Sequence, residues 1–221
     1  DTWVVNRGEV LAMHLAKNAG IDVVGAKLLH PVREPILLTS RFDRAENGGR
    51  RPFLSAHSLL HAQMTNRFDH LDLLRAMRKH CLNFEVDGPH FWKRLVFKRL
   101  IHDTSDDLSK TGFVYAGNDR WRLAPACGLR PRPVPVDSQH GDLDHGSGQR
   151  VTLQTLVEQA DAFGVNPVQV RLILRDQLNT IVYWKQWASE FFISMSAQDI
   201  QQIEPAMTNP QTQWARRLLE T

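Results

Sequence analysis

The pattern of apolar and polar positions in the first quarter of the chain predicts one helix followed by two short strands. Residues 9–18 (EVLAMHLAKN) place apolar side chains near one face of a helix, and the run stops at Gly20, a common helix end signal. Strand-like runs follow at residues 26–30 and 36–42, and residues 46–51 (ENGGRR) have the composition of a flexible turn. The β-structure expected in this region is therefore small.

The middle of the chain is predicted to combine helices with one β-hairpin. The expected elements are a helix capped by Ser55 that runs through residue 61, an amphipathic helix over residues 68–81, a helix opened by Pro89 that ends near residue 101, and a hairpin with strands at 112–115 and 121–123. The Gly117-Asn118 pair is a signal for the hairpin turn. Proline suits the start of a helix because its missing N–H needs no partner there.

The last third is predicted to be helical, after a long loop at residues 125–148 that is rich in Pro, Gly, Asp and His. A loop of this length is expected to be functional or mobile. The expected helices cover residues 152–163, 167–187 and 196–203. Ser196 and Asp199 have the spacing of a capping box. Three aromatic residues of the second helix are expected to pack between helices: Tyr183, Trp184 and Trp187.

Composition narrows the class of protein. The chain has 221 residues, of which 42% are hydrophobic and 23% charged, as in an ordinary soluble globular protein. No apolar run approaches the roughly 18 residues that a membrane span needs. The first residues are polar and charged, without a signal peptide or an initiator Met, so we expect a processed or trimmed product. Cys81 and Cys127 are too few for a disulfide framework and suggest the cytoplasm. A net charge of +3 does not by itself indicate nucleic-acid binding.

The segment over residues 96–130 carries the most functional information. A helix leads into an acidic loop with Asp103, Asp106 and Asp107, and the predicted hairpin follows with an exit at Pro125. Kinase-like folds carry catalytic and metal-binding residues in this order of elements. The three carboxylates could also hold a cation on their own, although a polar loop at a helix end is the simpler interpretation.

Together with other short matches, this segment resembles the HipA family of serine/threonine kinases, the toxins of bacterial toxin–antitoxin pairs. The matching pieces are residues 9–16 with 19–21, 41–44 (RFDR), 55–56, the acidic-loop frame, 122–126 (RLAPA) and 162–164. The resemblance implies an α+β fold that is mostly α. Residues 1–50 would be a remnant of the β-containing N-lobe with the hinge, and residues 51–221 the helical C-lobe. An unrelated helical scaffold is the alternative.

The resemblance also implies where a nucleotide would lie. In the family, the strand that ends in RFDR is the hinge that holds adenine, so Ser40 and Phe42 would take that position. Phe42 could equally be a buried strand aromatic. ATP and Mg²⁺ are the cofactors that the family uses to phosphorylate protein Ser or Thr residues. The family's Gly-rich loop and ATP-binding Lys precede the first helix, and nothing before Glu9 supplies them here.

The catalytic loop departs from the family pattern. Aligned without gaps, the family's catalytic Asp becomes Ser105 and its metal-binding Asn becomes Lys110. The family's second metal ligand, an Asp, becomes Gly128. A hydroxyl cannot replace a carboxylate as the base at neutral pH, and Mg²⁺ requires oxygen ligands. A one-residue slip would instead make Asp106 the base, place Lys110 on the family's Lys and place Thr111 on the family's Asn. We prefer the ungapped frame, because the slip needs a deletion and still leaves glycine at position 128.

These substitutions predict a HipA-like kinase-fold protein whose 221 residues do not form a competent kinase on their own. The alternative function is a non-catalytic binding module that docks a helix-turn-helix antitoxin or a translation-related protein client. In either case DNA would be reached only through such a partner, and no membrane contact is expected.

Overall fold

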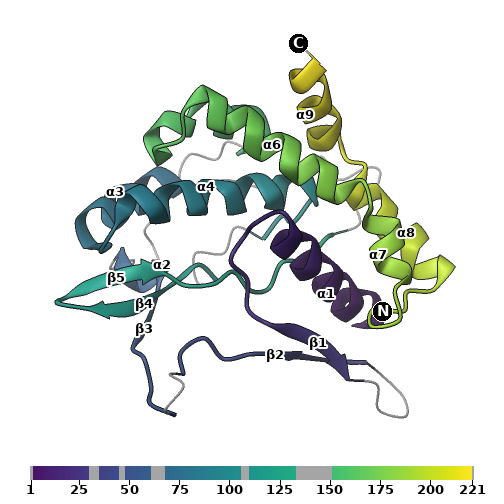
Figure 1. The fold of residues 1–221 in the computed structure, drawn as a ribbon, viewed down its shortest axis with the longest axis horizontal. Coiled ribbons are helices and arrows are strands. Elements are labelled where there is room, and N and C mark those ends of the chain that lie inside the picture. Colours follow the sequence, from purple (N-terminus) through teal and green to yellow (C-terminus); the bar gives the residue numbers. More distant parts are fainter. Residues whose placement is uncertain are drawn as a thin grey trace.

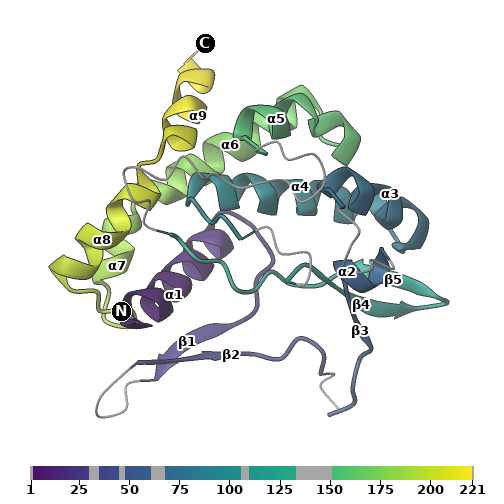
Figure 2. The same cartoon turned by 180° about the vertical axis from the view of Figure 1, so that it is seen from behind.

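The computed structural model describes residues 2–29, 35–44, 48–60, 68–105, 110–132 and 151–220. Within these ranges the protein is mostly helical, with two small antiparallel sheets below the main helices (Figures 1 and 2). The predicted class, α+β and mostly α, is confirmed. The described helices include none that combines the length and the hydropathy of a membrane span.

The elements follow one another along the chain with the bounds given next. The helices are α1 Thr2–Asn18, α2 Ala56–Leu59, α3 His70–His80, α4 Phe84–Leu100, α5 Leu153–Glu158, the 3-10 helix η1 Ala160–Phe163, α6 Pro167–Ile181, α7 Trp184–Ser189, α8 Ala197–Met207 and α9 Pro210–Glu220. The strands are β1 Ala26–Leu29, β2 Ile36–Thr39, β3 Phe53–Ser55, β4 Gly112–Gly117 and β5 Arg120–Leu123.

The first helix ends where the sequence predicts and begins earlier. Gly20 takes a φ of +72°, and the N–H of Ile21 donates to the carbonyl of Ala16 at 2.9 Å, which closes the end of α1. The helix starts at Thr2 instead of residue 9, because its first turns also pack on the body. A Cβ at Gly8 would lie only 3.1 Å from the side chain of Ile203 in α8, so a glycine serves this close contact.

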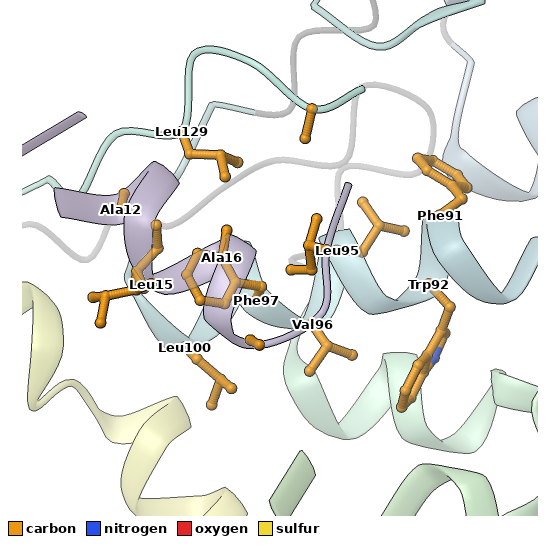
Figure 3. Close-up of a cluster of buried hydrophobic side chains, with 14 of the residues drawn as sticks. Ala12, Leu15, Ala16, Phe91, Trp92, Leu95, Val96, Phe97, Leu100 and Leu129 are labelled. Atoms are coloured by element: carbon orange, nitrogen blue, oxygen red, sulfur yellow. The ribbon is translucent and has the colours of Figure 1, made fainter. Parts of the chain in front are cut away.

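Helix α4 is the centre of the molecule and packs against α3, α5, α6, α9 and β5 (Figure 1). Its buried side chains meet those of α1 in one apolar core, with Leu129 covering the α1 side (Figure 3). The prediction that Pro89 opens this helix is wrong, because α4 begins at Phe84. The extra turn is held by contacts: the Arg78 guanidinium lies 4.1 Å from the Phe84 ring centre, and Gly88 packs on the carbonyl of Phe163. The domain division at residue 50 stays a prediction.

The C-terminal helices differ in four ways from the prediction. The run over 167–187 is broken at Val182 and Tyr183 into α6 and α7, and Tyr183 is 59% exposed, so its predicted burial is wrong. Trp184 is buried, as expected. The capping box of Ser196 and Asp199 is confirmed, but α8 continues to Met207 and α9 was not anticipated.

Two sheets flank the helical body. β1 pairs with β2, and β3, β4 and β5 form a second antiparallel sheet that contains the predicted hairpin. The ring of Phe53 lies directly over Gly112, where a Cβ would be 2.1 Å from it. Val23 forms a parallel bridge with Ala126. The segment that leaves α1 and the segment that leaves β5 therefore run side by side next to the second sheet.

Candidate functional site

A cleft of about 620 Å³ opens between the second sheet and the chain segments beside it. Its lining comes from five places: the segment after α1 (Asp22), the segment after β2 (Phe42), residues 50–52, Leu82 between α3 and α4, and the hairpin with its exit. This volume lies in the range of small-molecule sites, roughly 300–1,000 Å³. The cleft is therefore the candidate binding site of the described part of the chain.

The two residues predicted to hold a nucleotide are placed differently. Phe42 is half-buried and lines the cleft, with its ring 5.6 Å from that of Phe53 in an edge-on arrangement. Ser40 does not line the cleft. Its N–H donates to the carbonyl of Gly25 at 2.8 Å, and its hydroxyl lies 2.7 Å from where a Cβ of Gly25 would be. The ring of Phe42 thus packs against Phe53 and also lines the cleft.

Arginines around the cleft fall into two groups. Arg41 and Arg44 both bind Asp43, and the Arg41 hydrogen bond lowers the pKa of Asp43 to about 2. Among the residues that the structure describes, the three arginines of the cleft lining have no acidic partner at ion-pair distance: Arg50, Arg51 and Arg122. The cleft is therefore positively charged.

The loop after α4 is closed by the carboxylate of Asp103, which is fully buried. One of its oxygens accepts from the backbone N–H of Ser105 at 3.0 Å and from the Ser105 hydroxyl at 2.6 Å. The other accepts from the N–H of Arg130 at 3.1 Å. Asp103 therefore braces the loop against the segment that follows the hairpin, as an Asx-turn residue does.

The hydrogen bonds of Asp103 bear on the chemical roles that Asp103 and Ser105 can have. The Ser105 hydroxyl is already a donor to Asp103, and its carbonyl accepts from the Lys98 ammonium. The hypothesis that Asp103 joins Asp106 and Asp107 in a cation site stays a prediction. Asp106 and Asp107 lie outside the described residues. Within the described ranges, no group of three or more His, Cys, Asp or Glu side chains is arranged to hold a metal.

The structure brings Lys110 and Gly128 together. Gly128 has a φ of +66°, and a Cβ at this position would lie 3.9 Å from the Cδ of Lys110. In the ungapped frame, these are the two positions at which the family has metal-binding residues. The geometry thus places the lysine side chain beside a glycine, and the pair offers no oxygen ligand from a side chain.

A buried polar layer beneath the cleft was missed in the sequence. Desolvation lowers the pKa of Arg94 to about 10, and desolvation raises that of Asp87, which is on the same face of α4. Burial also raises the pKa of Cys127. The seven-residue spacing of Asp87 and Arg94 on one helix face was the available signal.

A second contact that the sequence did not reveal lies on the α1 side of this buried polar layer. Glu9 is buried and accepts a hydrogen bond of 2.7 Å from the Nε of Arg130. The two residues are 121 positions apart, so only the fold brings them together. Both ends of the segment that carries Gly128 are therefore fixed, one to the hairpin and the other to α1.

Comparisons with known proteins give a consistent result. A family model described as the HipA-like C-terminal domain matches residues 1–185. No curated protein matches the chain significantly in sequence. HipA of Shewanella oneidensis MR-1, solved with HipB and its operator DNA, has a TM-score of 0.67 at 14% identity, over 98% of this chain and 58% of that one.

A second solved structure has the same character. The proinflammatory kinase CtkA of Helicobacter pylori has a TM-score of 0.61 at 14% identity, over 97% of this chain and 81% of that one. At such identities the likeness shows the fold alone, which is kinase-like. The chain spans 58% of the length of the Shewanella protein, so it corresponds to part of that molecule.

Proposed function

Because this chain belongs to the HipA-like C-terminal domain family, we propose that it is a toxin–antitoxin kinase-fold protein whose centre does not transfer phosphate. The observation that carries the proposal is the Lys110 side chain beside Gly128, at the two metal-ligand positions of the ungapped frame. We place the protein in the cytoplasm, where its two free cysteines would stay reduced.

The chemistry of phosphoryl transfer supports this assignment. The reaction depends on Mg²⁺ bridging the phosphates and on a base that accepts the proton of the substrate hydroxyl. A cation at the metal position repels Mg²⁺, and neither Ser105 nor Asp103 offers a free carboxylate. Without the metal, the γ-phosphate is not activated, whichever loop residue would accept the proton of the substrate.

The test is phosphate transfer from radiolabelled ATP with Mg²⁺, to the chain itself and to a mixture of cytoplasmic proteins. We expect incorporation no higher than in the sample without this protein. Transfer that rises with the concentration of the chain would contradict the proposal. The Lys110→Asn variant serves as an internal comparison, because it removes the cation and leaves the glycine in place.

A second candidate function is docking of a helix-turn-helix antitoxin. It is favoured because the Shewanella HipA structure was solved with HipB and operator DNA. The protein would then act as a binding module and reach DNA only through its partner. Co-expression with a helix-turn-helix protein from the neighbouring reading frame should give a complex that survives gel filtration. Separate elution of the two proteins at micromolar concentration would exclude stable docking.

The first prediction concerns the metal complex of ATP. We expect Mg²⁺-ATP to bind weakly or not at all, because Lys110 and Gly128 supply no metal ligand. Isothermal titration calorimetry in excess Mg²⁺ measures the affinity. A dissociation constant in the micromolar range or tighter would show that the loop frame is misaligned.

The second prediction concerns restoration of the metal site. The double variant Lys110→Asn/Gly128→Asp should tighten Mg²⁺-ATP binding by about tenfold or more, since it replaces a like charge with two oxygen ligands. The gain is reduced by the left-handed backbone at position 128, although Asp tolerates this region better than most residues. Gly117→Asp is the matched control, with a φ of +92° and open space around it. Equal gains in both variants would disprove the ungapped frame.

A further inference from the structure

We infer that the cleft binds a nucleoside di- or triphosphate as the metal-free anion, with arginine side chains in place of Mg²⁺. The inference deepens the proposed function and rests on it in one respect only, the placement of Lys110 at the position of a metal ligand. It names the ligand class and the charge that neutralises the phosphates.

The first argument is charge. Three guanidinium groups and one carboxylate, Asp22, are among the described residues that line the cleft. Asp22 lies close enough to the buried Arg94 to favour its charged form, so its own charge is partly compensated. Among the described residues, no acidic side chain lies at ion-pair distance from Arg50, Arg51 or Arg122, and the buried Asp87 interacts with Arg122 only at longer range. Guanidinium groups bind phosphate oxygens through paired hydrogen bonds.

The contrast with the neighbouring arginines strengthens the argument. Arg41 and Arg44 precede the cleft residues by only a few positions, and both of them form ion pairs with Asp43. Among the described residues, these two arginines outside the cleft lining therefore have an acidic partner at ion-pair distance, and the three arginines of the lining have none. An anionic ligand would form ion pairs with Arg50, Arg51 and Arg122, as Asp43 does with Arg41 and Arg44.

The second argument is shape. Phe42 and Tyr115 give the cleft two aromatic side chains, and each ring is held by an edge-on neighbour, Phe53 and Trp121, at 5.6 Å. A purine or pyrimidine ring can stack on an aromatic side chain of this kind. The volume of about 620 Å³ accommodates a base together with its phosphates. The aromatic rings therefore suit the base of a nucleotide, and the guanidinium groups suit its phosphates.

Mg²⁺ should then act against binding. The metal complex carries less negative charge than the free nucleotide, so it is attracted more weakly by three arginines. The same logic predicts that added salt weakens the complex, because the cleft is open to solvent and its charges are screened.

The test is calorimetric titration of the whole chain with ATP and with ADP, first in excess EDTA and then in excess Mg²⁺. We expect binding in EDTA to be tighter, by roughly fivefold or more. Arg122→Gln and Arg51→Gln should each weaken binding in EDTA by roughly 10- to 100-fold, the effect of one charged hydrogen-bond donor. Arg120→Gln is the matched control on the same strand, because Arg120 donates to the carbonyl of Lys79 and does not line the cleft.

Three results would overturn the inference. They are tighter binding in Mg²⁺ than in EDTA, an equal loss in the Arg120→Gln and Arg51→Gln variants, and no saturable binding of ATP in EDTA at millimolar concentration. Tripolyphosphate tests the ring contact and should bind about tenfold more weakly than ATP, because it cannot stack. A single-stranded oligonucleotide that binds more tightly than ATP in the same buffer would identify a nucleic-acid site instead.

The outcomes also separate this inference from the proposed function. Absence of nucleotide binding together with absence of phosphate transfer would remove the inference and leave the proposed function standing. Mg²⁺-dependent binding together with transfer would remove both. Thermal unfolding of each variant is measured in parallel, since Arg122 also lies near the buried Asp87.

Discussion

Replacement of Asp103 by alanine is expected to lower the free energy of unfolding by about 3 kcal/mol, because a fully buried acceptor of three hydrogen bonds is lost. The N–H of Arg130 and both polar groups of Ser105 would then lose their common partner. Water replaces a buried acceptor only in part. Chemical denaturation in urea measures the change, with the slope of the transition showing whether the native state stays compact.

The control for this experiment is Ser105→Ala. It removes one of the three hydrogen bonds and leaves the carboxylate bound to two backbone N–H groups, so the expected loss is only about 1 kcal/mol. Similar losses in the two variants would mean that the Arg130 contact contributes little. A loss below about 1 kcal/mol for Asp103→Ala would show that the loop is not braced as the geometry indicates.

Local sequence signals predicted much of the fold, because their physics is complete within a few residues. The stop at Gly20, the cap at Ser55 and the capping box at Ser196 are all satisfied by groups within five positions along the chain. The start of α4 before Pro89 could not be predicted in the same way. Its extra turn depends on Arg78 and on the 3-10 helix near Phe163, which are brought there by the fold.

The candidate site likewise contains some residues that the sequence predicted and others that it did not. The motif frame predicted that positions 110 and 128 belong together, and the structure places them in contact range. Residues 50 and 51 gave no such signal, since a turn rich in glycine and arginine is typical of any exposed loop. They reach the cleft because β3 pairs with β4, a contact between segments about 60 positions apart. Long-range pairing is what a single sequence does not display.

The largest effect on activity is expected at Asp106, once the Gly-rich loop and the ATP-binding lysine of an N-lobe are supplied with the chain. Any transfer under those conditions must run through Asp106, because Ser105 has no carboxylate and both Asp103 oxygens are occupied. A positioned base contributes about 10²–10⁴-fold to the rate. Asp106→Asn should therefore reduce radiolabelled phosphate transfer to the background, and thermal unfolding of the variant shows whether the fold is intact.

Ser105→Ala is the comparison that separates the two loop frames. In the slipped frame Ser105 has no catalytic role, so transfer should persist in this variant while Asp106→Asn is silent. Transfer that is undiminished in Asp106→Asn would refute the assignment of the base. If the unmodified chain transfers no phosphate even with the N-lobe present, the result supports the binding module. In that case we propose as the physical reason that Lys110 and Gly128 supply no side-chain oxygen ligand for the metal.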